Sequence, residues 1–219
     1  MSWSDPINLY CERGNISFWA EPLNALSNAA FLIAAAAAFA HWKRHRVNDV
    51  ATLVLILVTC LVGLGSFAFH TFATRGALLA DVIPIALFIT FYLFFALRRF
   101  LNLALVPALA ILVFFIAISP GISVVLPRHF LNGSGQYLPA LAALIAVGTF
   151  TPAEATRHAI RLASFIFAVS LVFRTIDDAI CAAWPLGTHF IWHVLNAAVL
   201  YILLRTAASA EAAIKKARV

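Results

Sequence analysis

Long apolar runs separated by short polar loops recur along the 219 residues and restrict what this chain can fold into. A hydrocarbon core roughly 30 Å thick requires about 20 apolar residues per helix. Seven passes would use roughly 140 residues, which leaves too little sequence for a separate soluble domain. The predicted spans are residues 24–41, 50–69, 78–97, 101–118, 137–150, 160–176 and 190–204, of which the fifth is short and contains Pro139.

Composition agrees with a membrane-embedded chain, because 63% of the residues are hydrophobic and only 11% are charged. A soluble domain usually carries about a quarter charged residues, so a water-soluble enzyme and a nucleic-acid-binding module are both excluded. The alternating polarity of a membrane barrel is absent, and helices satisfy their own backbone in lipid. We therefore predict an all-α integral membrane protein with a seven-transmembrane helix bundle as its one domain, residues 1–219, comprising an outer segment 1–23 and a basic tail 205–219.

The distribution of basic residues predicts the orientation, since cytoplasmic loops are enriched in Lys and Arg. With the N-terminus outside, seven spans place eleven basic residues inside and four outside or near the outer interface. The inner set is Lys43, Arg44, Arg46, Arg98, Arg99, Arg157, Arg161, Arg205, Lys215, Lys216 and Arg218, and the outer set is Arg13, Arg75, Arg128 and Arg174. An N-terminus outside and a C-terminus in the cytoplasm follow.

The first span has a competing interpretation as a cleaved signal peptide, because Ala38-Phe39-Ala40 resembles a cleavage site. The preceding segment argues against this, since it contains Glu12 and Glu21 and lacks a basic region. Asn24, Ser27 and Asn28 also interrupt the apolar stretch. The alanine run 34–38 is most simply explained by close helix packing.

Three cysteines occur, and Cys60 lies within the second span as an apolar filler. Cys11 and Cys181 both fall in segments predicted outside, where thiols are oxidised and a disulfide can persist. Two free thiols remain the alternative, because the sequence does not show how close their Cα atoms lie.

Three histidines, His70, His189 and His193, lie at membrane depth, where an ionisable group is costly and therefore indicates function. His189 and His193 are one helical turn apart, which suits a shared metal ion or simple hydrogen bonding at an interface. His70 ends a span that runs outward, and the pair begins a span that starts outside. The three rings are therefore predicted at one depth, as in a catalytic zinc site whose fourth position is open to water.

Asp81 and Ser66 are predicted in the same layer. Asp81, in the first turns of the third span, would act as a general base and then a general acid beside the metal; a helix N-terminal carboxylate that favours the dipole is the alternative. Ser66 lies four residues before His70 on the same helical face and could hydrogen-bond an oxygen near the metal. Alternatively its hydroxyl is satisfied by a carbonyl of its own helix.

Two further polar clusters lie outside. Residues 8–15, followed by Glu21, offer carboxylate and amide oxygens of the kind that Ca²⁺ prefers, although a solvated polar arm is the simpler interpretation. At the end of the sixth span, helical spacing predicts an ion pair between Arg174 and Asp177 or Asp178, without a catalytic role.

Together these pieces resemble the alkaline ceramidase family, within the membrane hydrolase superfamily that includes the progestin and adipoQ receptors. The matching residues are Tyr10-Cys11-Glu12, Glu21 with Asn24, Ser27 and Asn28, Gly65-Ser66 through His70, Asp81, and His189 with His193. They run from residue 8 to about residue 201, and the intervals from Ser66 to His70, from His70 to Asp81 and from His189 to His193 match the family pattern.

The resemblance implies a seven-helix bundle in which His70, His189 and His193 bind zinc, Ser66 supports the oxyanion and Asp81 transfers protons. It also implies a disulfide between Cys11 and Cys181. A calcium site would map to Glu12, Asn15, Glu21, Tyr10 and Asn8, but Asn8 stands where the family has an aspartate. The spacing from Glu12 to Glu21 is also shorter than in eukaryotic members.

The reaction that the resemblance implies is hydrolysis of a ceramide-like membrane lipid to a fatty acid and a sphingoid base. Two alternatives stay open: a hydrolase of another N-acyl or ester lipid, and a lipid-binding receptor whose metal is structural. The alanine-rich sequence and short N-terminus favour a bacterial inner membrane.

Overall fold

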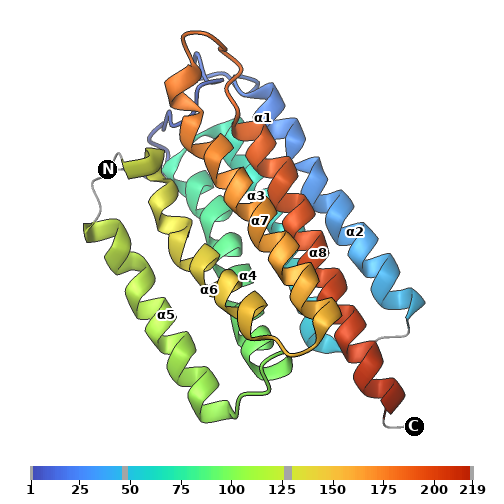
Figure 1. Cartoon of the computed structure of the whole chain (residues 1–219). Helices are drawn as coiled ribbons and strands as arrows, with labels where there is room; N and C mark the ends of the chain where they lie inside the picture. The colour runs from blue at the N-terminus through green and yellow to red at the C-terminus, as the bar shows by residue number, and fades with distance from the viewer. Residues whose placement is uncertain (1, 46–48, 126–129, 218–219) are drawn as a thin grey trace.

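The structure is a computed structural model that describes residues 2–45, 49–125 and 130–217, and these form a bundle of long helices (Figure 1). Arg46, Arg128 and Arg218, which contributed to the predicted orientation, lie outside the described residues. The α-helices are α1 (Pro22–Ser27), α2 (Ala29–Arg44), α3 (Val50–Phe72), α4 (Arg75–Arg99), α5 (Leu105–Val125), α6 (Leu138–Phe150), α7 (Glu154–Ile176) and α8 (His189–Ala217), with short 3-10 helices η1 (Phe130–Tyr137) and η2 (Asp178–Ile180).

Six segments of the described chain are long and apolar enough to cross a membrane, which fits a multi-pass membrane protein. They are Pro22–Arg44, Val50–Phe72, Arg75–Arg99, Phe130–Phe150, Glu154–Ile176 and His189–Ala210. Within α5, the stretch Leu105–Ser119 is apolar but shorter. The all-helical class is therefore confirmed, and six of the seven predicted spans coincide with such a segment.

Several helix ends differ from the predicted spans. The first span is broken at Asn28, between α1 and α2. The fourth begins at Leu105 instead of residue 101, and the backbone before it includes Asn102 at a left-handed φ of 53°. The sixth begins six residues early, at Glu154, and α8 continues to Ala217, so that most of the predicted tail is helical. Hydropathy marks the apolar length, whereas helices extend beyond it where polar side chains reach water.

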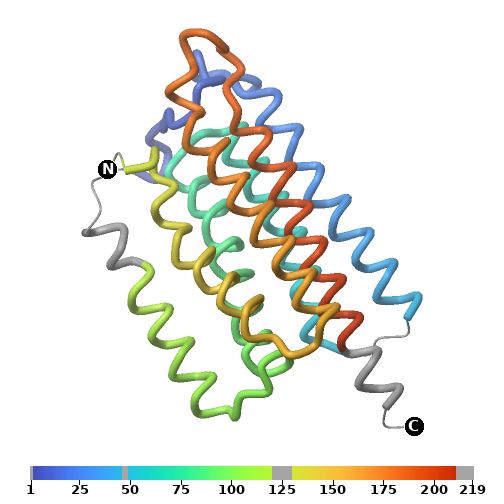
Figure 2. The backbone as a smooth tube through the Cα atoms, in the orientation of Figure 1, coloured from blue at the N-terminus to red at the C-terminus, as the bar shows by residue number. Residues whose placement is uncertain are grey.

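Helix α2 packs against α3 and α8, so the first predicted span is an integral part of the bundle. Ala34, Ala35 and Ala38 of the alanine run are buried there, whereas Ala36 and Ala37 are exposed, which confirms close packing for one face of the run. Helices α3 and α4 pair, as do α7 and α8. Helix α5 lies at the edge of the bundle and contacts α4 and η1 (Figure 2).

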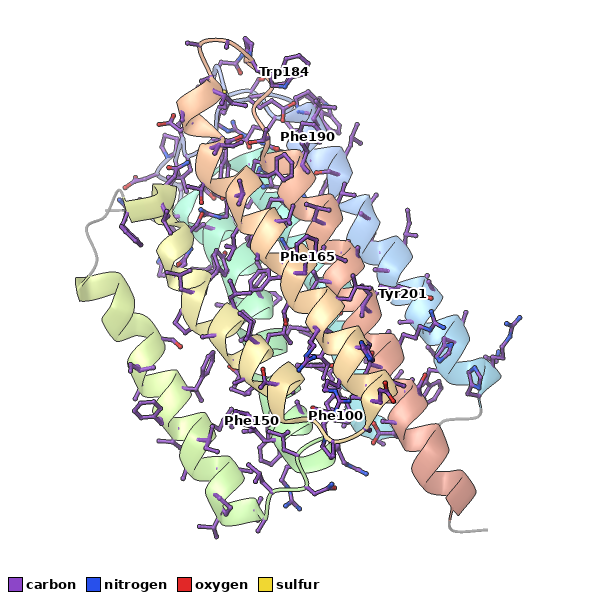
Figure 3. All side chains as sticks on the ribbon, viewed as in Figure 1. Phe100, Phe150, Phe165, Trp184, Phe190 and Tyr201 are labelled. Carbon is purple, nitrogen blue, oxygen red and sulfur yellow. A yellow bond between two sulfur atoms is a disulfide. The ribbon has the colours of Figure 1, made fainter. Side chains whose placement is uncertain are left out.

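The bundle has two unlike ends. We call the end with the N-terminal arm (residues 2–21), the α3–α4 turn and the α7–α8 loop the site end, and the opposite end the far end (Figure 1). The apolar core extends to the far end, where residues such as Leu55, Phe95, Leu204 and Ala207 are buried. Exposed side chains such as Phe150 and Phe165 point away from the core, as expected of a surface that faces lipid (Figure 3).

Candidate metal centre

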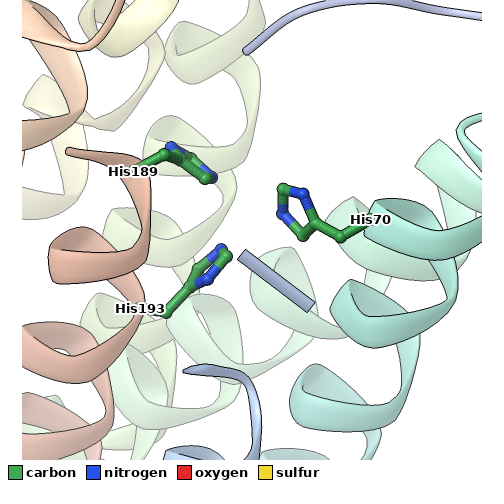
Figure 4. Close-up of side chains that lie close together, drawn as sticks. All are labelled: His70, His189 and His193. Atoms are coloured by element: carbon green, nitrogen blue, oxygen red, sulfur yellow. The ribbon is translucent and has the colours of Figure 1, made fainter. Parts of the chain in front are cut away.

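Three buried histidine rings meet at the site end, and they are the ones predicted from the sequence (Figure 4). One ligand atom from each of His70, His189 and His193 lies within 4.8 Å of the other two. The ring centroids are 5.2 Å apart for His70 and His189, 4.8 Å for His70 and His193, and 4.6 Å for His189 and His193. The chain therefore brings together residues from α3 and α8 that lie more than a hundred positions apart.

Helix ends place these rings. His70 lies in the last turn of α3, which stops because Ala73 adopts a left-handed φ of 44°. His189 is the first residue of α8, and His193 follows one turn later. The Asp177 carboxylate accepts hydrogen bonds from the backbone N–H groups of Thr188 at 2.7 Å and of His189 at 2.9 Å. It thereby satisfies donors at the start of α8 that have no partner within the helix.

Two of the rings are oriented by hydrogen bonds from their Nδ1 atoms to residues outside the histidine cluster. Glu21 Oε2 lies 2.6 Å from His70 Nδ1, and Ser27 Oγ lies 2.7 Å from His193 Nδ1. Partners of this kind set the tautomer and the angle of a metal-binding imidazole. Nε2 of each ring is then the nitrogen left for a shared ligand.

Unpartnered nitrogens show that the residues present fit a metal ion. His70 Nε2 and His189 Nδ1 are buried, and neither has a hydrogen-bond partner among the described residues. Leaving such a group unpaired costs about 1–3 kcal/mol. Nitrogen ligands are accepted by zinc in tetrahedral geometry, so the cluster has the donor set of a three-histidine zinc centre.

Asp81 and Ser66 face each other across the contact between α3 and α4. Ser66 and His70 both lie within electrostatic range of the Asp81 carboxyl. Both side chains are buried, and Asp81 Oδ1 has no hydrogen-bond partner among the described residues. The close approach depends on Gly65, since a Cβ at that position would lie 1.9 Å from the carbonyl oxygen of Ala80.

The structural alternatives for these two residues are disfavoured. Asp81 is the seventh residue of α4, beyond the first turn, and Thr74 caps that helix through Ala77 N–H at 3.2 Å. Thr59 and Thr71 of α3 donate to carbonyls of their own helix, whereas Ser66 lies beside the Asp81 carboxyl.

The residues of the predicted calcium site have other partners. The Glu12 carboxylate accepts from Leu23 N–H at 2.7 Å and Asn24 N–H at 2.8 Å, at the start of α1. Asn8 Nδ2 donates to the Arg13 carbonyl, and Asn15 Oδ1 accepts from Ser17 N–H. The Tyr10 ring stacks on His189 with centroids 3.7 Å apart. These side chains do not assemble into an open oxygen site, so this part of the resemblance is not supported.

Glu21 is the most highly connected of that predicted set. It forms an ion pair with Arg13 and accepts from Asn24 Nδ2 at 3.0 Å, in addition to bonding His70. Burial alone would raise the pKa of Glu21, but the hydrogen bonds from His70, Arg13 and Asn24 outweigh it and lower the pKa below its usual value. Glu21 is therefore a buried carboxylate that links the arm to the metal centre.

A disulfide joins Cys11 to Cys181, with their Cα atoms 5.4 Å apart, as the resemblance implied. It connects the N-terminal arm to the α7–α8 loop, close to Asp177, which accepts a hydrogen bond from Cys11 N–H at 3.1 Å. Cys60 is a free, half-buried cysteine beside the apolar core, as predicted.

The predicted ion pair between Arg174 and Asp177 or Asp178 is wrong. Among the described residues Arg174 forms no ion pair with either aspartate and donates instead to the Asn132 carbonyl at 2.8 Å and to Ser134 Oγ at 3.3 Å. Asp177 instead caps α8. The prediction assumed that Arg174 and the aspartates lie on one helix, but α7 ends at Ile176, before either aspartate.

An apolar cavity adjoins the metal centre on its inner side. Its walls include Phe31, Val62, Ile85, Phe88 and Trp192. Each of three wall residues is close in sequence to a site residue: Val62 lies one turn from Ser66, Ile85 one turn from Asp81, and Trp192 next to His193. The cavity is therefore adjacent to the candidate catalytic groups. A hydrocarbon chain matches such a lining.

Four supporting residues were not assigned these roles from the sequence: Arg13, Glu21 as a histidine partner, Ser27 and Asp177. The signal for Ser27 was its polarity within the first apolar stretch, but nothing indicated which ring it would meet. Its contact with His193 spans 166 positions of the chain.

Fold and site together define a multi-pass helical membrane protein with a buried cluster of three histidines beside a carboxylate, a serine and an apolar cavity. The family model described as Ceramidase matches residues 8–218, nearly the whole chain, and the protein belongs to this family. The comparison with curated proteins found no match. Membership of the family confirms the resemblance and supports a ceramide-hydrolysing function and a lipid substrate.

Proposed function

We propose that this protein is a zinc-dependent amidase that hydrolyses ceramide-like lipids to a fatty acid and a sphingoid base. The observation that carries the proposal is the pair of buried ring nitrogens, His70 Nε2 and His189 Nδ1, that lack hydrogen-bond partners within the three-histidine cluster. The family match supports hydrolysis of ceramide, and the nitrogen ligands favour zinc.

A bound zinc ion supplies Lewis-acid chemistry, lowering the pKa of a water molecule toward roughly 7 and polarising a carbonyl group. Asp81 would accept a proton from the attacking water at its unpartnered Oδ1 and later give it to the departing amine. Ser66 donates a hydrogen bond to the amide oxygen as negative charge develops there, a contact whose loss in other enzymes costs about 3 kcal/mol. Glu21 and Ser27 hold the rings of His70 and His193 in orientation.

The substrate's hydrocarbon is accommodated by the apolar cavity lined by Phe31, Phe88 and Trp192. The amide group then lies at its polar end, between Ser66 and the histidines. This arrangement keeps the tail in an apolar environment while the site end remains close to the membrane surface, where water is available.

We further propose one domain, residues 1–219, whose seven helical passes place the N-terminal arm outside and the C-terminus in the cytoplasm of a bacterial inner membrane. The charge distribution supports this orientation. The disulfide at the site end also suits an oxidising compartment.

The test combines metal analysis of the purified protein with mass spectrometry of products from ceramide. We expect about one zinc per chain, release of fatty acid and sphingoid base, and loss of both zinc and turnover in His193→Ala. His158→Ala, which changes an exposed histidine at the far end, is the matched control and should keep both. Full zinc occupancy in His193→Ala, or full turnover by folded protein stripped of zinc, would contradict the proposal. Release of fatty acid from N-acyl amino acids but never from ceramide would reject the substrate.

A further inference from the structure

Arg13 is a buried cation in the N-terminal arm, with only 6% of its surface exposed. Its guanidinium forms an ion pair with Glu21 through Nε and Oε1. One terminal nitrogen donates to the carbonyls of Asn15 at 3.2 Å and Ser17 at 3.4 Å, and the other donates to the carbonyl of His70 at 2.8 Å. One carboxylate oxygen and three carbonyl oxygens therefore surround a single positive charge.

These oxygens favour a cation for two reasons. The His70 carbonyl lies in the last turn of α3 and has no partner within the helix, and the partial negative charge of a helix C-terminus attracts cations. Carboxylate and carbonyl oxygens are also the ligands that a hard metal ion takes. In this chain the guanidinium already satisfies them.

The Glu12 carboxylate of the arm is already engaged at the start of α1. Both oxygens of Glu12 accept backbone N–H groups at the start of α1, and the second oxygen of Glu21 is shared by His70 and Asn24. A divalent ion would have to displace Arg13 or uncap α1.

We propose that Arg13 is the resident cation of the N-terminal arm and stands where the family resemblance implies calcium, so that this protein folds and holds its arm without Ca²⁺. The guanidinium ties the arm to the C-terminus of α3 and keeps Glu21 in place beside His70. Arg13 is a positioning residue, and the proposal concerns the arm whether or not the centre binds zinc.

The first measurement uses the unaltered protein. After removal of divalent ions and return of zinc alone, equilibrium dialysis with ⁴⁵Ca²⁺ at millimolar concentration should find well below one tenth of a calcium ion per chain, and added calcium should leave the melting temperature unchanged. One calcium ion per chain, or a melting temperature that rises with calcium, would overturn the proposal.

The second measurement removes the charge with Arg13→Ala. Breaking a buried ion pair is strongly destabilising, so we expect the melting temperature to fall by roughly 10 °C. The variant leaves the carboxylate and carbonyl oxygens around an empty space, and we expect millimolar Ca²⁺ to restore part of the loss. The double variant Arg13→Ala, Glu21→Gln should not respond, because the carboxylate that would attract the ion is gone.

Arg75→Ala is the matched control, since Arg75 also forms an ion pair with the arm, at 3.8 Å from Asp5, but is about half exposed. It should shift the melting temperature by less than about 2 °C.

An Arg13→Ala protein as stable as the parent would overturn the proposal, as would calcium rescue that persists without Glu21. If Arg13→Ala fails to fold, Arg13→Lys, which keeps the charge, should still fold and stay insensitive to calcium; failure of that variant to fold without calcium would count against the proposal.

Discussion

The two ends of the bundle handle buried polar side chains in different ways. At the far end, hydroxyls such as those of Thr151 and Ser164 bond to carbonyls of their own helix, Val147 and Ile160 respectively. At the site end, buried polar side chains bond across elements distant in sequence, as Glu21 does to His70 and Ser27 to His193. Bonds between helices also occur toward the far end, as from Tyr92 to the Leu203 carbonyl and from Arg161 to the Gly148 carbonyl. Those at the site end differ because they converge on the histidine rings, and the buried polar atoms without a partner among the described residues lie at that end.

This difference shows which hydrogen bonds fix the positions of side chains relative to one another. A hydroxyl that bonds within its own helix is satisfied wherever that helix lies, so such a bond does not fix how the helices are arranged. A bond between elements is satisfied in one arrangement only. The site end therefore holds its rings and carboxylates in fixed relation, which a catalytic or metal-binding centre requires.

The largest effect should come from Asp81→Asn, because an amide keeps the shape of the side chain but does not accept a proton. We expect turnover of ceramide to fall roughly 10²–10⁴-fold while zinc content and melting temperature stay unchanged. Asp178→Asn, an exposed aspartate at the same end, is the control and should leave turnover as it is. Undiminished turnover in Asp81→Asn would refute the proton-transfer role.

Gly65→Ala should come next. The added Cβ would lie 1.9 Å from the Ala80 carbonyl oxygen, so α3 and α4 must separate, at a cost of about 3 kcal/mol. Thermal unfolding should show a drop of roughly 6–12 °C, and turnover should fall because Asp81 moves away from Ser66. Gly14→Ala provides the comparison, since nothing lies within 4 Å of a Cβ at that position. Equal melting curves for the two variants would show that the close approach is not required.

Glu21→Gln should weaken zinc binding roughly 10- to 100-fold, because His70 loses the carboxylate that orients it. Competition with a chromophoric chelator measures the change. Glu154→Gln alters an exposed carboxylate at the far end and should leave zinc affinity unaffected. If the two variants bind zinc equally well, the bond from Glu21 to His70 has no role in holding the metal.

The smallest effect should separate two serines that both donate to a carbonyl of their own helix, of which only Ser27 also bonds a histidine ring. Ser27→Ala removes the bond to His193 and should weaken zinc binding about tenfold. Ser164→Ala removes a bond to a carbonyl of its own helix and should change neither zinc affinity nor stability by more than about 0.5 kcal/mol. The same competition assay and unfolding curves decide; equal zinc affinities would contradict the distinction between the two ends.

Much of the site could be predicted because ionisable groups at membrane depth need an explanation. His70, His189 and His193 were recognised from their positions at the ends of apolar runs and from the alternating direction of the spans. Asp81 and Ser66 followed from helical spacing on the same layer. These arguments use only periodicity and depth, and both are properties of the sequence.

The supporting contacts could not be predicted, because they depend on which surfaces meet after packing. Arg13 was interpreted as an outer charge, and its burial against Glu21 and the end of α3 depends on the path of a segment without regular periodicity. Helix ends were inexact for a related reason: hydropathy reports the width of the hydrocarbon, whereas Glu154 starts α7 beyond it.

The bond between Cys11 and Cys181 joins positions separated by 170 residues and so closes most of the chain into a covalent ring. A protease that cuts any one loop within this ring would produce two fragments still joined through sulfur, with His70 and His193 in one linked molecule. Such a nicked protein would migrate as a single species on a non-reducing gel and as two after reduction.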